Sequence, residues 1–393
     1  MSTTTTNLTP TLTNIASQSK QTVTSLWENT SKLMNDLDET FQTYLLYIII
    51  IIIIICYLIY LSYLAGLKTS QCDYINNLYS DIDGYIVPIS ITSDYSHKLI
   101  DYYIKTAYNA CSGGEYKNSY VDVCVLKAII KQGVRCLDFE VYSMDNQPVV
   151  ASSTSSSYFI KETFNYVPFS KVMEVIDSYA FANGTAPNPT DPIILHLRIK
   201  STRQEIYTNL ASLFSNYKKM LGLEYSYINT GKNLGMEPLL SFKNKIILIV
   251  DGTNDSFLEN EQFLEYVNLT SSSIFMRLYR STEIKNNPDI YELTDFNRSN
   301  MTIVLPDKES SPENPNGIIC RNYGCQMVAM RYQYVDQYLL ENTAFFNREG
   351  SAFALKPERL RYQPILIPEP PPQNKDYSYD TRVVSTEYYT YNI

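Results

Sequence analysis

The sequence predicts an α/β protein in which one transmembrane helix precedes a single large barrel. Three observations lead to this prediction. An apolar run without a charged residue extends from Thr43 to Ala65. Behind it, β-rich segments alternate with helical patterns up to about residue 362. The chain has 393 residues, 45% of them hydrophobic, so the part behind the apolar run can bury a full core.

The N-terminal segment, residues 1–42, begins rich in Ser and Thr and then carries apolar residues at mostly three- and four-residue intervals. This spacing predicts an amphipathic helix. Three interpretations stay open: the helix extends the transmembrane helix, associates with a second copy of itself, or lies on the membrane surface. Its apolar stripe consists of Val23, Leu26, Leu33, Leu37 and Phe41.

The predicted transmembrane helix covers residues 43–66. At about 1.5 Å per residue it is long enough to cross roughly 30 Å of hydrocarbon. A cleaved signal peptide is disfavoured, because the run is too long and acidic residues between Asp36 and Glu39 precede it. Lys32 and Lys68 flank the helix on opposite sides, so the positive-inside rule does not set its orientation. We therefore expect a single-pass membrane protein of undetermined topology.

The barrel prediction, residues 85–362, depends on the alternation of strands and helices. Such alternation predicts a mainly parallel sheet with crossover helices, which closes most economically as a barrel with its chemistry at the C-terminal ends of the strands. The expected helices are FSKVMEVIDSYAF and a long one from Thr202 to Leu221. The expected strands are GVRCLDFEVY, PIILHLRI, NKIILIVD, SIFMRLYR, GCQMVAM and SAFALKP.

The last segment, residues 363–393, is rich in Pro and Tyr. Because prolines interrupt both helices and central strands, we expect this tail to be extended and disordered.

Charge and cysteine content exclude several classes of protein. A net charge of -9 without any Lys/Arg-rich run argues against a nucleic-acid partner. Seven cysteines at irregular spacing indicate neither a zinc site nor a disulfide framework, so we expect mostly reduced thiols. Asn-x-Ser/Thr triplets do not decide the topology in a chain so rich in these residues; they begin at Asn183, Asn254, Asn268, Asn297 and Asn300.

Three segments in a fixed order carry a resemblance to a known family. They are GVRCLDFEVYSMDNQPVV, PIILHLRI and the stretch from GCQMVAM to KPERLR. Together they resemble the catalytic barrel of the eukaryotic phosphoinositide-specific phospholipases C, with its X and Y halves. The resemblance covers about Val87 to Arg361 and implies a TIM-barrel-like phosphodiesterase fold.

The resemblance implies two catalytic histidines, and this chain lacks both. The aligned motifs read AYNA and VASS, which place Tyr108 and Ser152 at the histidine positions. The chain's two histidines, His97 and His196, fall elsewhere and are expected to be a surface and an interior side chain. Tyrosine titrates near 10 and serine far higher, so neither replaces an imidazole at neutral pH.

The family's calcium ligands are also altered. The resemblance implies a set of oxygen ligands, of which Asn109, Asp138 and Glu140 remain, whereas Arg198 replaces the last glutamate. A guanidinium cannot bind a metal, so we expect no calcium and no other cofactor. We expect Arg198 to supply the positive charge instead, in an ion-paired cluster with Asp138 and Glu140. A salt bridge without any ligand role is the alternative.

The resemblance implies that this chain keeps part of the family's head-group recognition. Arg277 and Tyr279 align with the family's substrate-binding arginine and tyrosine, although packing alone also explains them. Ile249 and Asp251 replace the two phosphate-binding lysines, and a carboxylate at Asp251 would repel a phosphate.

These features predict a membrane-anchored phospholipase C-like protein that is catalytically inactive and serves as a lipid- or protein-binding barrel. Membrane lipid is the expected partner, with phosphatidylinositol as the first candidate. The alternative is a diverged, calcium-independent phosphodiesterase that cleaves inositol phospholipids, with Tyr108 or His196 in a new role. In a third interpretation the barrel is a scaffold, and the N-terminal helix or the tail makes the functional contact.

Overall fold

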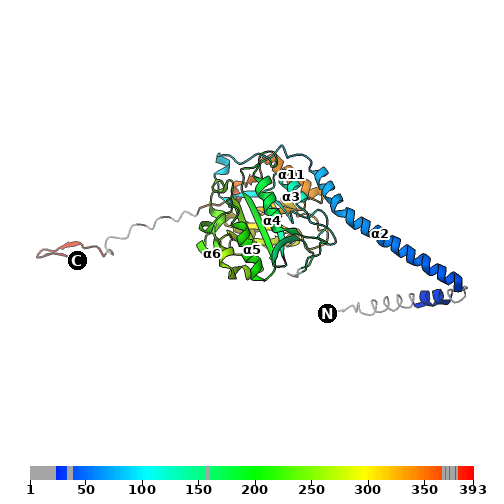
Figure 1. The fold of residues 1–393 in the computed structure, drawn as a ribbon. Coiled ribbons are helices and arrows are strands. Elements are labelled where there is room, and N and C mark those ends of the chain that lie inside the picture. The colour runs from blue at the N-terminus through cyan, green and yellow to red at the C-terminus, as the bar shows by residue number, and fades with distance from the viewer. Residues whose placement is uncertain are drawn as a thin grey trace, which may run out of the picture.

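The computed structural model describes residues 24–32, 39–91, 93–155, 160–364, 368, 371, 377 and 379–393. Within these residues the chain forms a long N-terminal helix, a barrel and a C-terminal hairpin (Figure 1). Residues 24–32 are helical and include Leu26 of the predicted stripe, whose side chain is exposed. Val23, Leu33 and Leu37 lie outside the described residues.

The barrel consists of eight parallel strands in the order β7-β6-β5-β2-β1-β10-β9-β8. The two end strands, β7 and β8, lie close together without pairing, so the barrel is nearly closed. This confirms the predicted parallel barrel. The strands are β1 (Tyr102–Ala107), β2 (Cys136–Met144), β5 (Ile193–Lys200), β6 (Ile246–Asp251), β7 (Leu269–Ser271), β8 (Met276–Arg280), β9 (Met301–Leu305) and β10 (Met327–Met330).

Three short strands extend the sheet, each by antiparallel pairing with its neighbour. β3 (Gln147–Ala151) pairs with β2, β4 (Val167–Pro168) pairs with β3, and β11 (Phe353–Leu355) pairs with β1. The predicted segment SAFALKP is therefore a strand, but it lies beside β1 and not within the parallel ring.

Helices cover the outside of the barrel. The predicted helix from Thr202 to Leu221 is shorter in the structure, where α5 ends at Phe214. The Ser215 and Asn216 side chains bond back to the Ser212 carbonyl there. The α-helices are α3 (Val123–Lys131), α4 (Phe169–Val175), α5 (Gln204–Phe214), α6 (Tyr227–Thr230), α7 (Glu261–Leu264), α8 (Ser281–Lys285), α9 (Ile290–Ser299), α10 (Gly317–Asn322) and α11 (Gln337–Glu349).

Short helical segments complete the connections. The π-helix η3 (Ile176–Ala180) continues α4. The 3-10 segments are η1 (Ser93–Tyr95), η2 (Leu99–Asp101), η4 (Leu223–Tyr225), η5 (Leu234–Met236), η6 (Leu239–Phe242), η7 (Ser256–Glu259) and η8 (Glu358–Leu360).

Alternation along the strands creates two hydrophobic cores. On β2, Leu137, Phe139 and Val141 face outward and pack with helices α3, α4 and α5. Cys136 faces the other way, into an apolar layer inside the barrel to which Ile194 of β5 also belongs. Successive strand residues point to opposite faces, so one pattern of alternating residues fills both cores.

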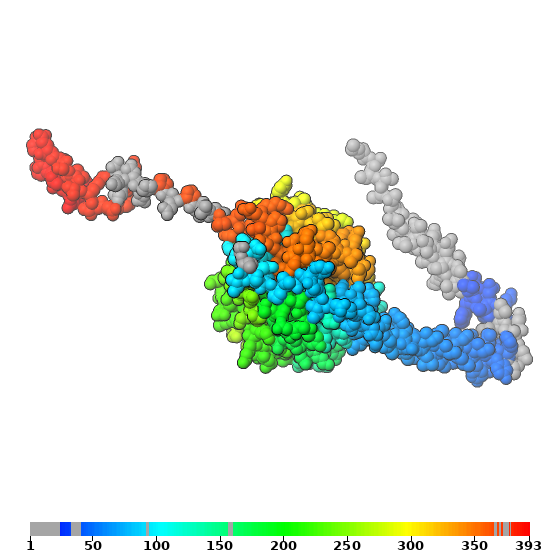
Figure 2. All heavy atoms as spheres, turned by 90° about the horizontal axis from the view of Figure 1, so that it is seen from above, coloured from blue at the N-terminus to red at the C-terminus, as the bar shows by residue number. Residues whose placement is uncertain are grey.

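The N-terminal helix α2 runs from Glu39 to Leu78 and leaves the barrel as a single rod (Figure 2). Its segment Phe41–Leu78 is long and apolar enough to cross a membrane, with a mean hydropathy of 3.0 over an 18-residue stretch. The apolar run ends near residue 66, but the helix continues because its last turns dock on the barrel. Ile75 is fully buried in the outer core, and the hydroxyl of Tyr79 donates to the Tyr332 carbonyl at 2.8 Å.

A disulfide joins this docked part of α2 to α3. Cys72 and Cys124 form it, a pairing that the sequence analysis did not predict when it expected mostly reduced thiols. The remaining cysteines are free. Sequence spacing gave no signal because the two partners lie 52 residues apart, on two elements that only the fold brings together.

The C-terminal tail is not wholly disordered. β12 (Val383–Ser385) and β13 (Thr390–Asn392) form an antiparallel hairpin that lies apart from the barrel in Figure 1. The prediction of disorder is therefore wrong for this hairpin. Much of the proline-rich part, including residues 365–367 and 372–376, lies outside the described residues.

Candidate functional site

A polar cluster lies inside the barrel, between β2 and β5. The two strands pair in parallel register, with Asp138 opposite His196 and Glu140 opposite Arg198. These four residues alternate with the outward-facing residues of the same strands, so their side chains share the inner face. They lie further along their strands than the inner apolar layer, toward the C-terminal ends where barrels of this type carry their chemistry.

Arg198 connects the predicted members of this cluster. Its Nε donates to Asp138 Oδ1 at 2.9 Å, and its Nη2 donates to Asp138 Oδ2 at 2.7 Å and to Asn109 Oδ1 at 2.9 Å. Its Nη1 donates to Glu140 Oε1. The structure therefore brings together all four residues that we assigned to the metal or ion-pair cluster. None of them is more than 3% exposed, so the cluster is closed to solvent.

The cluster is ionised despite its burial. Burial would raise the pKa of both carboxyl groups, but the Arg198 guanidinium outweighs this effect. The pKa of Glu140 falls to about 2, and the pKa of Asp138 lies below its usual range. Lys308 adds a second positive charge, with its Nζ 2.5 Å from Glu140 Oε1. In turn, the carboxylates outweigh the effect of burial on Arg198 and raise its pKa.

His196 belongs to the cluster, which the sequence analysis did not foresee. Its Nδ1 lies 2.7 Å from Asp138 Oδ1, and its Nε2 lies 2.9 Å from Ser271 Oγ. This Asp–His–Ser connection matches that of a hydrolase triad. All three side chains have no exposed surface, so a substrate cannot reach the serine in this state. The sequence did carry one signal for His196. It stands two residues before Arg198, which places both side chains on the same face of the strand.

The residues at the two histidine positions are buried hydroxyl groups. The Arg198 guanidinium lies 4.8 Å from the centre of the Tyr108 ring, and burial raises the pKa of Tyr108 above its ordinary value. Its phenol therefore stays protonated at neutral pH. Ser152 is fully buried, and its hydroxyl accepts a hydrogen bond of 3.4 Å from Ser112. Neither position offers a group that exchanges protons near neutral pH.

Arg277 and Tyr279 lie outside this cluster, so the structure does not bring the two predicted substrate-binding residues to it. Arg277 forms a two-fold ion pair with Glu292 of α9, at 2.7 and 2.6 Å, outside the barrel. Tyr279 packs against the outer core. The alternation of β8 turns Arg280 inward instead, where its Nη1 lies 3.5 Å from the Tyr108 hydroxyl.

Three cations form the rim of the site, which we define as Lys200, Arg280 and Lys308. All three are partly exposed, whereas the carboxylates of Asp138 and Glu140 are buried. Lys308 also donates to the Ser153 and Ser155 carbonyls at 3.3 and 3.4 Å. Partial burial, together with the charge of Arg198, lowers the pKa of Lys200 to about 8. The rim therefore presents positive charge above a sealed ion-pair cluster.

Family comparisons agree with this architecture. Residues 95–251 match the family model "Phosphatidylinositol-specific phospholipase C, X domain", and residues 254–359 match the corresponding Y domain. A search of the curated proteins gave no match.

Two solved structures have a similar fold. PLC21 from L. pealei has a TM-score of 0.53 and 19% identity, and PLC21 from S. officinalis has a TM-score of 0.54 and 20% identity. In both cases the match covers 68% of this chain but only 38% of the other. At this identity the likeness establishes the fold alone, while the two family models establish the family. The chain belongs to the phosphatidylinositol-specific phospholipase C family, through its X and Y domains.

Proposed function

We propose that this protein is a membrane-anchored, catalytically inactive member of its family, whose barrel binds the phosphate of inositol lipids without cleaving them. Helix α2 is the proposed anchor, because its apolar part is exposed and long enough to cross a bilayer. The rim of Lys200, Arg280 and Lys308 is the proposed binding surface.

The observation that carries the loss of catalysis is the sealed cluster around Arg198. In active relatives, the resemblance implies, two histidines and a calcium ion act on the phosphate at this end of the barrel. Here Tyr108 and Ser152 stand at the histidine positions, and Arg198 is bonded to two carboxylates and an amide. Its donors are occupied by protein oxygens, so they are not available to a transition state.

Charge at the rim supports phosphate binding. Lysine and arginine side chains form strong, charge-assisted hydrogen bonds with phosphate oxygens. The carboxylates that would repel a phosphate are either neutralised within the cluster or, at Asp251, occupied by hydrogen bonds from Thr253 and Ser272. A lipid head group is the favoured source of phosphate because of the neighbouring anchor.

The docking direction of α2 supports access to the bilayer. α3 connects two parallel strands, so it begins near the C-terminal ends of the strands and returns to their N-terminal ends. Cys72 of α2 is bonded to Cys124 at the start of α3, whereas the Ser80 carbonyl accepts from Lys131 at the end of α3. The apolar part of α2 therefore leaves the barrel on the side of the rim.

Phosphorus NMR tests binding and cleavage in one sample. Full-length protein in detergent would be titrated with water-soluble dibutanoyl phosphatidylinositol. We expect the phosphodiester signal to shift or broaden without any new signal from an inositol phosphate. Arg280→Gln should weaken the effect, whereas Lys171→Gln, at an exposed lysine on α4, should not.

Two results would contradict the proposal. A growing inositol phosphate signal would show that the barrel is a calcium-independent phosphodiesterase. An unchanged phosphodiester signal would exclude the lipid-binding role and favour protein partners.

A further inference from the structure

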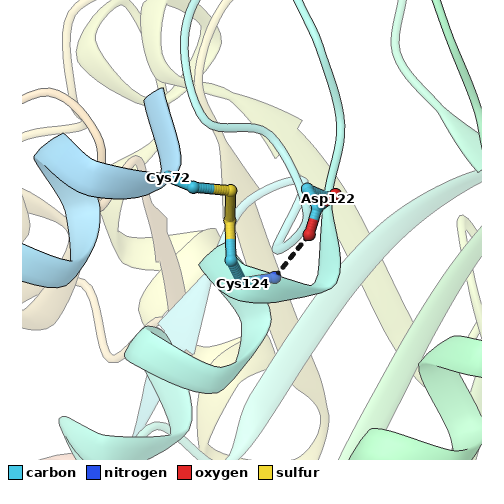
Figure 3. A group of neighbouring side chains, drawn as sticks. All are labelled: Cys72, Asp122 and Cys124. Atoms are coloured by element: carbon cyan, nitrogen blue, oxygen red, sulfur yellow. Dashed lines mark hydrogen bonds between the residues drawn. A yellow bond between two sulfur atoms is a disulfide. The ribbon is translucent and has the colours of Figure 1, made fainter. Parts of the chain in front are cut away.

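A disulfide and several non-covalent contacts connect helix α2 to the barrel. The Cys72–Cys124 disulfide crosses from α2 to the first turn of α3 (Figure 3), and its Cα atoms lie 5.9 Å apart, a usual separation for a disulfide. Asp122 accepts a hydrogen bond from the Cys124 backbone N–H at 2.9 Å and forms an ion pair with Lys68 at 2.8 Å. Ile75 is fully buried one turn further on. These contacts lie on both sides of the disulfide and fix the relative position of α2 and α3 together with it.

A disulfide of this kind indicates the compartment of the barrel. Structural disulfides persist in oxidising compartments and on cell or virion surfaces, whereas the cytosol keeps thiols reduced. The other cysteines are consistent with such an environment, because Cys56 lies in the apolar run and the rest are at most 2% exposed. Buried thiols cannot readily form wrong pairs with Cys72 or Cys124. The buried free cysteines are Cys111, Cys136, Cys320 and Cys325.

One Asn-x-Ser/Thr triplet on the barrel is presented to solvent. Asn183 is exposed, in the turn after η3, and Gly184 follows it with a φ of +87°. The Asn268 and Asn297 side chains are buried. Asn254 uses its amide to donate to the Ile199 and Ser201 carbonyls, and Asn300 accepts from Asn233. Asn300 is partly exposed, and Asn183 is therefore the one fully exposed asparagine among the triplets of the barrel.

We infer that the barrel lies on the oxidising, non-cytosolic side of the membrane and that Asn183 carries an N-linked glycan. The inference rests on the proposed anchoring by α2 and assigns it a topology, with residues 1–42 in the cytosol. A disulfide-bearing oxidoreductase accepts the two electrons and two protons of the cysteine thiols. Asn183 Nδ2 bonds to the anomeric carbon of a lipid-linked oligosaccharide, with loss of an amide proton and departure of the lipid pyrophosphate.

The test uses full-length protein expressed in eukaryotic cells with a secretory pathway. After carbonate extraction, the membrane fraction would be treated with a glycosidase that removes N-linked glycans. We expect a mobility shift in the wild type and its loss in Asn183→Gln. Mass spectrometry without reduction should find the peptides of Cys72 and Cys124 linked.

The chain supplies its own control for the opposite topology. Asn7–Leu8–Thr9 and Asn29–Thr30–Ser31 are acceptor triplets on the other side of the anchor. Glycans on Asn7 or Asn29 in a retained membrane protein would overturn the topology alone, and free thiols at Cys72 and Cys124 would also overturn it. An unmodified Asn183 beside a formed disulfide would overturn the glycan assignment. Release by carbonate would overturn the proposed anchor, on which the inference rests.

Discussion

Arg198 organises the polar interior of the barrel at the scale of single residues. It neutralises Asp138 and, together with Lys308, Glu140, at the position where the resemblance implies a calcium ion in the family. A buried ion pair adds little net stability compared with an apolar core, but removal of one partner leaves a buried charge without compensation. The cluster is thus sensitive to changes in one member.

We expect Arg198→Met to destabilise the barrel by about 3–5 kcal/mol, because Asp138 and Glu140 lose their main counter-charge. Arg277→Met is the matched control, since its ion pair with Glu292 is partly exposed and should contribute at most about 1 kcal/mol. Urea denaturation of both variants, followed by near-UV circular dichroism, measures the difference. Equal losses in the two variants would contradict the role given to Arg198.

The pH dependence of stability follows from the same carboxylates. The folded-state pKa of Glu140 is about 2, below its ordinary 4.5, so the unfolded chain binds more protons between these values. The contribution of Glu140 is therefore complete above about pH 4.5 and is lost as the pH falls toward 2. Urea midpoints from pH 7 to pH 2.5 should fall more steeply for wild type than for Glu140→Gln. Parallel curves would argue against this assignment.

Alternation along β2 and β5 made part of the site predictable. Asp138 and Glu140 stand two residues apart, and so do His196 and Arg198, so each pair had to share one strand face. The face of β8 on which Arg277 lies was not predictable. In a strand of uncertain register, either of the two alternating sets of side chains can face the interior. Lys308 and Arg280 are distant in sequence from the residues they contact, and only the closed barrel places Lys308 beside Glu140 and Arg280 beside Tyr108.

At the scale of elements, α2 combines a membrane-spanning part with a docked part. Composition revealed the first part, because an uncharged apolar run is unmistakable in sequence. The second part is polar on its outer side, and its helical extension to Leu78 depends on contacts with α3 that have no local signal. In the same way, β5 and β6 were predictable from runs of β-branched residues, whereas the short β7 was not.

We expect loss of the disulfide to loosen this docking. Cys72→Ser should destabilise the barrel by about 2–4 kcal/mol and increase hydrogen exchange over the last turns of α2. Cys56→Ser is the control, because Cys56 is free and lies in the apolar run. Hydrogen exchange of both variants in detergent gives the answer. Unchanged protection near Cys72 would mean that the non-covalent contacts suffice.

At the scale of the whole molecule, the docked turns of α2 and the Cys72–Cys124 disulfide connect the proposed anchor to the barrel. The docked turns of α2 fix the barrel relative to the proposed membrane helix, and the direction of α2 along α3 turns the rim of Lys200, Arg280 and Lys308 toward the bilayer. In the proposed function, a barrel held in this way would meet lipid phosphates at the membrane surface. In this proposal the fold serves to place the rim at the membrane, while the Arg198 cluster inside the barrel is closed to solvent.

The most direct test of lost catalysis is lipid cleavage by the full-length protein in proteoliposomes that contain phosphatidylinositol. Diacylglycerol release would be measured with calcium and with a chelator, next to protein-free liposomes. We predict release no higher than the protein-free background in both conditions, because the histidine positions hold Tyr108 and Ser152 and the donors of Arg198 are occupied. Release above background that Ser152→Ala or Tyr108→Phe abolishes would contradict the account and show that the barrel is an enzyme.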